Sequence, residues 1–240
     1  MKKLCSSLIM AALVIAVLAV SAEAQDKPRL GVLRFTNQTS AGWWSAAVGS
    51  ELSDMLASEL VSTGSFSVLE RKEIEAVLGE QDLGATGRID QATRAKMGKI
   101  KGAEFLVAGT VSSYEERIGG GGGGVAYRGV RLGGKKDRVY IAVDLKVIDT
   151  ETGEIVDART IEAEASAAGL DAGVNYRGFS VRGGGYEKTP AGQAIRACII
   201  YLTEYLECSL LYGPDSRCMK KWDQMEQKRR DRTKGAIKIK

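Results

Sequence analysis

The chain has 240 residues, with 34 basic and 30 acidic side chains, a formal net charge of +4 and no histidine. A net charge this small argues against a nucleic-acid partner. The missing histidine excludes Ser-His-Asp and Cys-His catalysis and histidine-ligated metal sites, and no acidic pair stands out as a catalytic one. We therefore expect no enzyme, no catalytic residue, no metal site and no cofactor.

The first residues resemble a secretory signal peptide over residues 1–24. Two lysines precede an unbroken apolar run, Leu8–Val20, and the string SAEA offers an A-x-A cleavage site. We expect an exported protein that begins after residue 24. Cys5 lies before the apolar run, so no lipid-acceptor cysteine stands at the expected cleavage point.

Residues 25–113 alternate between strand and helix patterns. Strands are expected at Arg29–Phe35, Phe66–Leu69 and Glu104–Ser113. Helices are expected from Trp43 to Gly64, over residues 70–81 and over residues 90–103. Gly64 and Gly102 are the expected helix stops, and Asp90 is an expected N-cap. This order of elements predicts a small α/β domain.

The middle of the chain combines a clear hairpin with two glycine-rich stretches. The strand Val139–Val147 should pair with Ile155–Ala165 across the turn DTETGE. Six glycines, Gly119–Gly124, precede one alternating stretch, and Ala165–Gly185 alternates and ends in three more. Neither run leads into a helix as a phosphate-binding loop does. A flexible loop and a membrane hairpin both remain open interpretations.

In the membrane interpretation, alternate residues of the two stretches belong to strands that cross the bilayer. The candidate residues are Tyr127, Val130, Leu132, Leu170, Val174, Tyr176 and Phe179. Arg128 is costly on a lipid-facing side. A lone hairpin leaves backbone groups unpaired at its edges, which lipid cannot satisfy. This interpretation therefore requires several chains that close one shared barrel.

The C-terminal part predicts two helices and a basic tail. The first helix, Ala191–Leu211, is amphipathic, and the second, Pro214–Arg232, is highly charged. Cys208 and Cys218 flank the turn between them, which makes them the favoured disulfide pair in an oxidising compartment. Buried free cysteines are the alternative, because the third cysteine in this part of the chain, Cys198, leaves an odd number.

Four strings, in this order along the chain, resemble the CsgG family of curli production assembly/transport proteins. They are SVLERKEIEAVLGEQ, FLVAGTVSSYEERIGGGGGGVAYRGV, YIAVDLKVIDTETGEIVDA and TPAGQAIRACIIYLTEYL. The resemblance covers nearly all of the chain from Leu30 to Leu211. It implies an α+β fold, in which a small α/β periplasmic domain bears two long β-hairpins that complete an oligomeric β-barrel.

The resemblance also implies a function and a division of the chain. It implies a ring of about nine copies in the outer membrane, facing the periplasm, that passes unfolded fibre subunits without nucleotide. The expected segments are a signal peptide (1–24), the first part of the α/β domain (25–113), a first extended hairpin (114–147), a turn and strand of the periplasmic sheet (148–160), a second extended hairpin (161–187), C-terminal helices (188–232) and a basic tail (233–240).

In the family, a loop between the first strand and the first helix narrows the channel. By this resemblance the narrowing residues are Thr39, Trp43 and Trp44. The alternative for the two tryptophans is an anchor at the start of the helix, packed on the core. The alternative for the whole chain is a soluble periplasmic binding or adaptor module with the same α/β domain and no pore.

Overall fold

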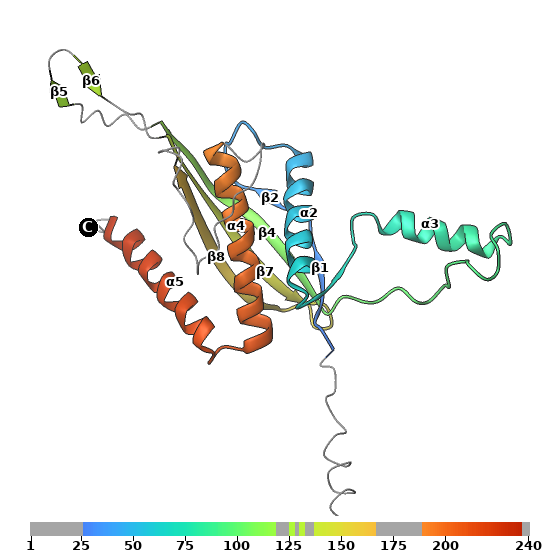
Figure 1. Ribbon diagram of the computed structural model, residues 1–240. Helices are drawn as coiled ribbons and strands as arrows, with labels where there is room; N and C mark the ends of the chain where they lie inside the picture. Colours follow the sequence, from blue (N-terminus) through green and yellow to red (C-terminus); the bar gives the residue numbers. More distant parts are fainter. Residues whose placement is uncertain (1–25, 119–124, 128–129, 133–136, 167–188, 237–240) are drawn as a thin grey trace, which may run out of the picture.

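The computed structural model describes residues 26–118, 125–127, 130–132, 137–166 and 189–236 (Figure 1). The expected signal peptide and most of the second hairpin lie outside these residues. Their main body is one mixed sheet with the strand order β3-β1-β4-β7-β8, and β2 also pairs with β4. The strands are β1 (Arg29–Val32), β2 (Thr36–Asn37), β3 (Ser67–Leu69), β4 (Phe105–Ile118), β7 (Asp137–Asp149) and β8 (Ile155–Ser166).

The sheet is parallel on one side and antiparallel on the other. β1 runs parallel to β3 and β4, whereas β4, β7 and β8 form an antiparallel series. Together with the helices this confirms a mixed α+β class. In the part of the chain that the structure describes, the sheet is open, so the shared barrel remains a prediction.

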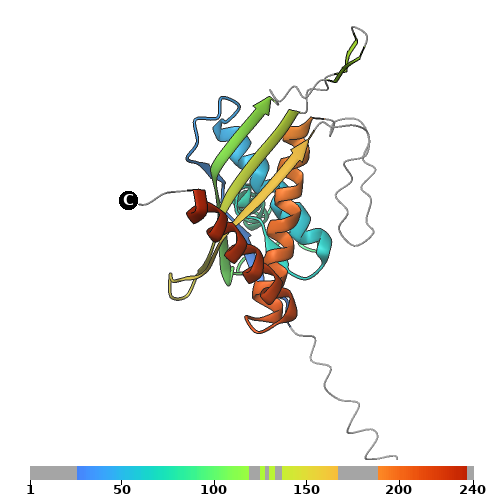
Figure 2. The same cartoon turned by 90° about the vertical axis from the view of Figure 1, so that its left-hand side faces the viewer.

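Two helices, α2 (Ala46–Thr63) and α4 (Pro190–Glu207), cover one face of the sheet (Figures 1 and 2). Helix α2 begins at Ala46, three residues after the expected start at Trp43, and it ends at the predicted stop, Gly64. The Ser45 hydroxyl accepts the Val48 N–H, and Gly64 ends the helix in a left-handed conformation at φ 69°. The core below these helices includes Leu52, Leu56, Leu60, Leu202, Leu206, Val107, Val143 and Val147, all of which are buried.

The turn between β7 and β8 confirms the predicted hairpin. The Asp149 carboxylate accepts the N–H groups of Glu151 and Thr152, both at 2.8 Å. Gly153 takes a positive φ of 74° directly after them. These backbone bonds hold the pKa of Asp149 below its usual range, with desolvation opposing them. The string DTETGE therefore forms its own turn from local contacts.

A bulge interrupts the pairing of β4 with β7 between Val111 and Ser113. Val107 and Val111, before the bulge, are buried beneath the helices. The extra residue reverses the alternation, so that Tyr114, opposite Ile141, lies on the helix-covered face. The bulge therefore decides which side of the sheet receives the first aromatic residue of the strand's outer half.

Several predicted elements differ from the structure at their boundaries; β4, for example, continues to Ile118 rather than ending at Ser113. The first strand ends at Val32 rather than Phe35, and the Phe35 N–H bonds instead to the Gly49 carbonyl at 3.1 Å. The helix expected over residues 70–81 is α3 (Ile74–Ala85). At the C-terminus, α4 is followed by a π-helical turn, η1 (Cys208–Tyr212), and by α5 (Arg217–Ala236).

The helix expected over residues 90–103 is wrong. This segment consists of turns, in which the Asp90 carboxylate accepts the Ala92 N–H at 3.1 Å and Gly98 has a φ of 74°. Its apolar side chains gain nothing from a helix, because they have no surface to pack on: Met97 is 61% exposed and Ile100 40% exposed. We call α3 and residues 86–103 the arm, which projects from the sheet in Figure 1.

Candidate functional site

The loop between β2 and α2 carries the three residues expected to narrow a channel. Asn37 organises its first half, because its side-chain oxygen accepts both the N–H of Thr39 (2.9 Å) and the Thr39 hydroxyl (2.7 Å). The same hydroxyl accepts the Ala41 N–H at 3.2 Å. The Gln38 N–H donates to the Val111 carbonyl at 2.9 Å, which ties the loop to β4. The loop is therefore held by its own polar contacts.

The second half of the loop is held by aromatic packing. The Trp43 and Trp44 ring centroids lie 5.7 Å apart, and the Trp43 ring lies 4.8 Å from the Tyr114 ring, both in edge-to-face arrangements. We call Trp43, Trp44 and Tyr114 the aromatic group. Trp44 also packs against the core, where a side chain at Gly49 would come within 3.1 Å of its ring.

The structure therefore brings together two of the three expected residues and adds one. Thr39 bonds within its own turn, whereas Trp43 and Trp44 join Tyr114. Tyr114 was not expected at this site, because its side of the sheet depends on the bulge at residue 112, and no simple alternation predicts a bulge. Burial raises the pKa of Tyr114, and the nearby Glu116 carboxylate, 3.3 Å from its hydroxyl, raises it further.

One buried polar atom of the aromatic group has no hydrogen-bond partner among the described residues. It is Nε1 of Trp43, which is buried although the residue as a whole is half-exposed. A buried indole N–H normally finds an acceptor. Trp43 therefore holds a buried donor without an acceptor in the described part of the chain.

The expected membrane residues are only partly within the described chain. The strands β5 (Val125–Tyr127) and β6 (Val130–Leu132) form an antiparallel ladder. In it Tyr127 lies opposite Val130, and Leu132 lies opposite Val125. Leu170, Val174, Tyr176 and Phe179 lie outside the described residues.

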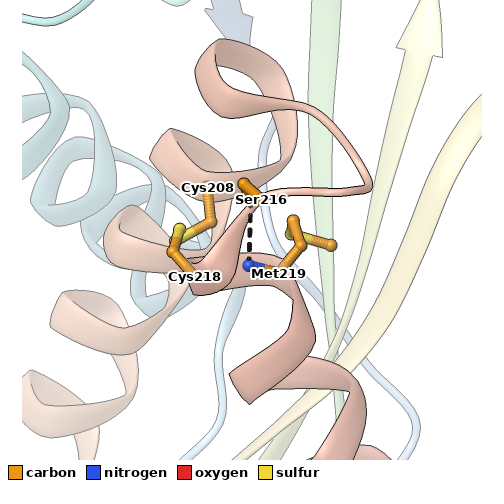
Figure 3. The surroundings of a disulfide bond; sticks show 4 residues. All are labelled: Cys208, Ser216, Cys218 and Met219. Atoms are coloured by element: carbon orange, nitrogen blue, oxygen red, sulfur yellow. Dashed lines mark hydrogen bonds between the residues drawn. A yellow bond between two sulfur atoms is a disulfide. The ribbon is translucent and has the colours of Figure 1, made fainter.

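The favoured cysteine pair is joined in the structure. A disulfide links Cys208 to Cys218 across 10 residues, with their Cα atoms 5.7 Å apart (Figure 3). Next to it the Ser216 hydroxyl accepts the Met219 N–H at 3.1 Å and so caps α5 (Figure 3). Cys198 is a buried thiol, and burial raises its pKa to about 12. The disulfide therefore fixes the beginning of α5 against the end of α4.

A polar cluster that the sequence did not predict joins β8 to the C-terminal helices. The Asp157 carboxylate accepts the Tyr205 hydroxyl at 2.7 and 2.8 Å and also the Ser209 hydroxyl. The Arg159 guanidinium lies 5.1 Å from the centre of the Tyr205 ring and bonds Asp223 at 2.8 Å. These residues come from separate elements, so local spacing in the sequence carries no signal for them.

Two ionisable groups of this region have shifted pKa values. Burial raises the pKa of Tyr205 to about 12; Arg159 opposes the rise and Asp157 adds to it. In α5 the Arg229 and Arg230 side chains, at 2.8 and 2.6 Å, lower the pKa of Glu226 to about 2. The Tyr205 contacts join α4 to β8, whereas the Glu226 ion pairs lie within α5.

Two features are absent from the described residues. No group of three or more His, Cys, Asp or Glu side chains there could hold a metal ion. None of the helices among the same residues is both long and apolar enough to cross a membrane.

Solved structures resemble the chain at a distance. The hypothetical protein CT253 from Chlamydia trachomatis matches with a TM-score of 0.46 and 15% identity, over 78% of this chain and 100% of that one. A PelC dodecamer from Paraburkholderia phytofirmans matches with a TM-score of 0.36 and 11% identity, over 73% of this chain and 83% of that one.

Sequence comparison gives a more specific relationship. Curli production assembly/transport components CsgG from Salmonella typhimurium and from Escherichia coli K12 are each 27% identical over 142 residues. The match covers 56% of this chain and 51% of each relative, so the chain spans about half the length of these curated relatives. The family described as "Curli production assembly/transport component CsgG" matches residues 12–237. The chain belongs to the CsgG family.

Proposed function

We propose that this protein is a subunit of a curli-type secretion channel. It is exported, loses residues 1–24 and assembles into a ring of about nine copies in the outer membrane, facing the periplasm. The ring passes unfolded fibre subunits by diffusion, without nucleotide, cofactor or enzymatic activity. The protein has no nucleic-acid partner, consistent with its small net charge of +4.

The observation that carries this proposal is the extent of the family match. It runs over residues 12–237 and so includes both glycine-rich stretches as well as the α/β body. We assign the α/β body to residues 25–113 and 148–160, the C-terminal helices to 188–232 and the basic tail to 233–240. The two extended hairpins are residues 114–147 and 161–187.

The geometry of the sheet supports two hairpins that leave it in the same direction. Ile118 at the end of β4 pairs with Asp137 at the start of β7, and Arg138 pairs with Ser166 at the end of β8. The three strand ends therefore lie at one end of the sheet (Figure 2). Beyond these points the first hairpin has 18 residues (119–136) and the second has 21 (167–187), against about 20 for two crossings.

The aromatic group supports a narrow passage at this same end. Tyr114 belongs to the outer part of β4, and Trp43 lies on it. We assign Thr39, Trp43 and Trp44 to the constriction, where rings repeated around a bore offer weak, unspecific contacts to an extended chain.

Assembly is the first test. Membranes extracted in detergent should yield rings of high mass by native mass measurement and negative-stain imaging. Recovery of the mature protein entirely in a periplasmic wash, as a monomer or dimer, would instead support a soluble adaptor module and overturn the channel.

Ion conductance tests the constriction. Trp43→Ala should raise the single-channel conductance, because it removes a large side chain from the narrowest part. Tyr212→Ala is the matched control: Tyr212 is an aromatic residue that is 67% exposed and remote from the loop, and its loss should change nothing. Thr39→Trp should lower the conductance. If neither loop variant alters it, these residues do not line the bore.

A further inference from the structure

Helix α5 is fastened to the body of the protein at one end. Its buried residues, Met219 and Trp222, lie within four positions of Cys218, which the disulfide joins to Cys208 directly after α4 (Figure 3). Every later residue of the helix is half-buried or exposed. Beyond Trp222 the contacts of α5 with β8 therefore have little apolar packing behind them.

The later part of α5 is only loosely attached to the sheet. A groove of about 870 Å³ remains between it and β8. Two ion pairs link helix and strand, Arg159 with Asp223 at 2.8 Å and Arg232 with Glu162 at 3.1 Å. In each pair one side chain is more than half exposed, and exposed ion pairs add little stability in salt. Their restraint is small beside that of a covalent bond between residues 10 positions apart.

The position of the disulfide favours exchange with an external thiol. Cys208 and Cys218 are both half-buried, whereas Cys198 is buried, and burial raises its pKa to about 12. Cys218 is the second residue of α5 and follows Arg217, and both the helix N-terminus and this cation stabilise a thiolate there. The Cys218 sulfur is therefore the favoured leaving group.

The exchange requires a dithiol as its co-reactant. One thiolate of the dithiol attacks Sγ of Cys208, which breaks the disulfide and releases the Cys218 thiolate. The second thiolate of the dithiol then attacks the mixed disulfide and releases Cys208. Two electrons and two protons pass to the protein, whose disulfide becomes two thiols, and the dithiol becomes a disulfide. The oxidised dithiol reverses these steps.

From these features we infer that α5 is a redox-controlled strap. While the disulfide is formed, α5 lies against β8. Reduction of the bond by a dithiol releases the helix and uncovers the Trp222 ring and its partners, the rings of Tyr201 and Tyr205. The released helix unwinds in part, because most helical stability in proteins comes from packing. The strap itself requires no ring and no pore. That it closes on passage into an oxidising compartment rests on the proposed export.

Hydrogen exchange followed by mass spectrometry tests the strap on the full chain in detergent. Dithiothreitol should reduce the disulfide in the folded protein and speed amide exchange in residues 217–236 about a hundredfold. This factor is the restraint expected from a disulfide that closes a loop of this size. Exchange in α4 should stay unchanged, and oxidised dithiothreitol should restore the protection of α5.

Hydroxyl-radical labelling of tryptophans distinguishes release of α5 from fraying of its end. Trp222 is 9% exposed while the strap is closed, and reduction should raise its labelling several-fold. Trp44, which packs against the core from the loop before α2, is the internal control and should not change. Faster exchange in α5 without stronger labelling of Trp222 would mean that the helix frays in place, which contradicts the strap.

Matched cysteine variants locate the effect. Cys208→Ser and Cys218→Ser should each show the fast exchange of α5 without reductant, and dithiothreitol should change it no further. Cys198→Ala removes the buried thiol of α4 and should respond to dithiothreitol as the wild type does. Circular dichroism checks that each variant is folded, and the reduced wild type gives the same comparison without any substitution.

Three further results would overturn the inference. One is equal exchange of α5 in the oxidised and the reduced protein. Another is an equal loss of protection in α4 and α5, since the bond would then stabilise the whole fold. The third is a disulfide that dithiothreitol reduces only after denaturant has unfolded the chain. None of these results depends on conductance, so failure of the strap leaves the proposed channel to its own tests.

Discussion

Helices α3 and α4 have similar sequence patterns but differ in how much of their apolar face is buried. Both carry apolar residues at three- and four-residue spacing, but α4 buries seven residues against the sheet and α2, whereas α3 buries only Gly84. In α3 the side chains of Val77 and Leu78 are 42% and 45% exposed. Periodicity thus predicts that a helix has an apolar face, and it does not predict whether the same chain covers that face.

Helix α5 is intermediate between α3 and α4 in the number of residues that it buries. It buries only Met219 and Trp222, and the Trp222 ring meets those of Tyr201 and Tyr205 edge to face, at 6.4 and 5.5 Å. Beyond Trp222 it is held to the sheet by ion pairs. A helix attached by a few apolar side chains, a disulfide and charges should respond to salt, pH and reductant more than α4 does.

The largest effect is expected where α4 enters the core. Leu202→Ala removes a side chain that is 0% exposed, and should lower the free energy of unfolding by about 3 kcal/mol. Denaturant unfolding of the two proteins, with equal slopes, measures the difference. A loss below about 1 kcal/mol would mean that α4 does not depend on its apolar contacts as the comparison requires.

A smaller loss is expected where the sheet meets the loop. A side chain at Gly109 would lie 2.4 Å from the Phe35 ring, which is itself 2% exposed. Gly109→Ala must displace that ring, at a cost of about 2 kcal/mol. Gly102→Ala is the control, because nothing lies within 4 Å of its added carbon. Equal thermal unfolding of both variants would contradict the packing described for Phe35.

Much of this body could be predicted because its signals are local. The stop at Gly64 and the DTETGE turn each depend on residues a few positions apart. Elements without a packing partner were predicted less well. The expected helix over residues 90–103 had suitable end signals, and these formed turns because no surface stabilises a helix there.

The residues of the candidate site also differ in whether their contacts are local in the sequence. Trp43 and Trp44 could be assigned through resemblance, since they are neighbours in one loop. Tyr114 depends on a bulge, and Asp157, Tyr205 and Ser209 meet only after β8 and α4 have packed together. Contacts between residues 48 and 52 positions apart leave no periodic signal in a single sequence.

Tyr205→Phe tests the polar attachment of α4 to β8. The Asp157 carboxylate loses one of its two hydroxyl donors, which should cost about 1.5 kcal/mol near neutral pH. The folded wild type keeps the Tyr205 proton up to a pKa of about 12, whereas the unfolded chain loses it near 10. Wild-type stability should therefore fall between pH 10 and 12, and the stability of the variant should fall less steeply, because Cys198 and Tyr114, whose pKa values are also raised, remain. Tyr212→Phe, at an exposed position, should behave as wild type throughout.

Glu226→Gln tests the ion pairs within α5. The pKa of Glu226 is about 2 in the folded protein, below its ordinary value of 4.5, because Arg229 and Arg230 stabilise the carboxylate. Its contribution, about 1 kcal/mol, is complete above pH 4.5 and is lost as the pH falls towards 2. The variant should therefore be less stable at pH 7 and equal to wild type near pH 2. Glu80→Gln, in α3, should show no such convergence.

The smallest effect on folding is expected in the arm. Leu78→Ala shortens a side chain that is already 45% exposed, and alanine is the better helix former, so stability should change by less than about 0.5 kcal/mol. Denaturant unfolding at two protein concentrations checks this. A loss that approaches that of Leu202→Ala, and that grows with concentration, would mean that another copy covers α3. The contrast between α3 and α4 would then belong to the single chain and not to the assembled protein.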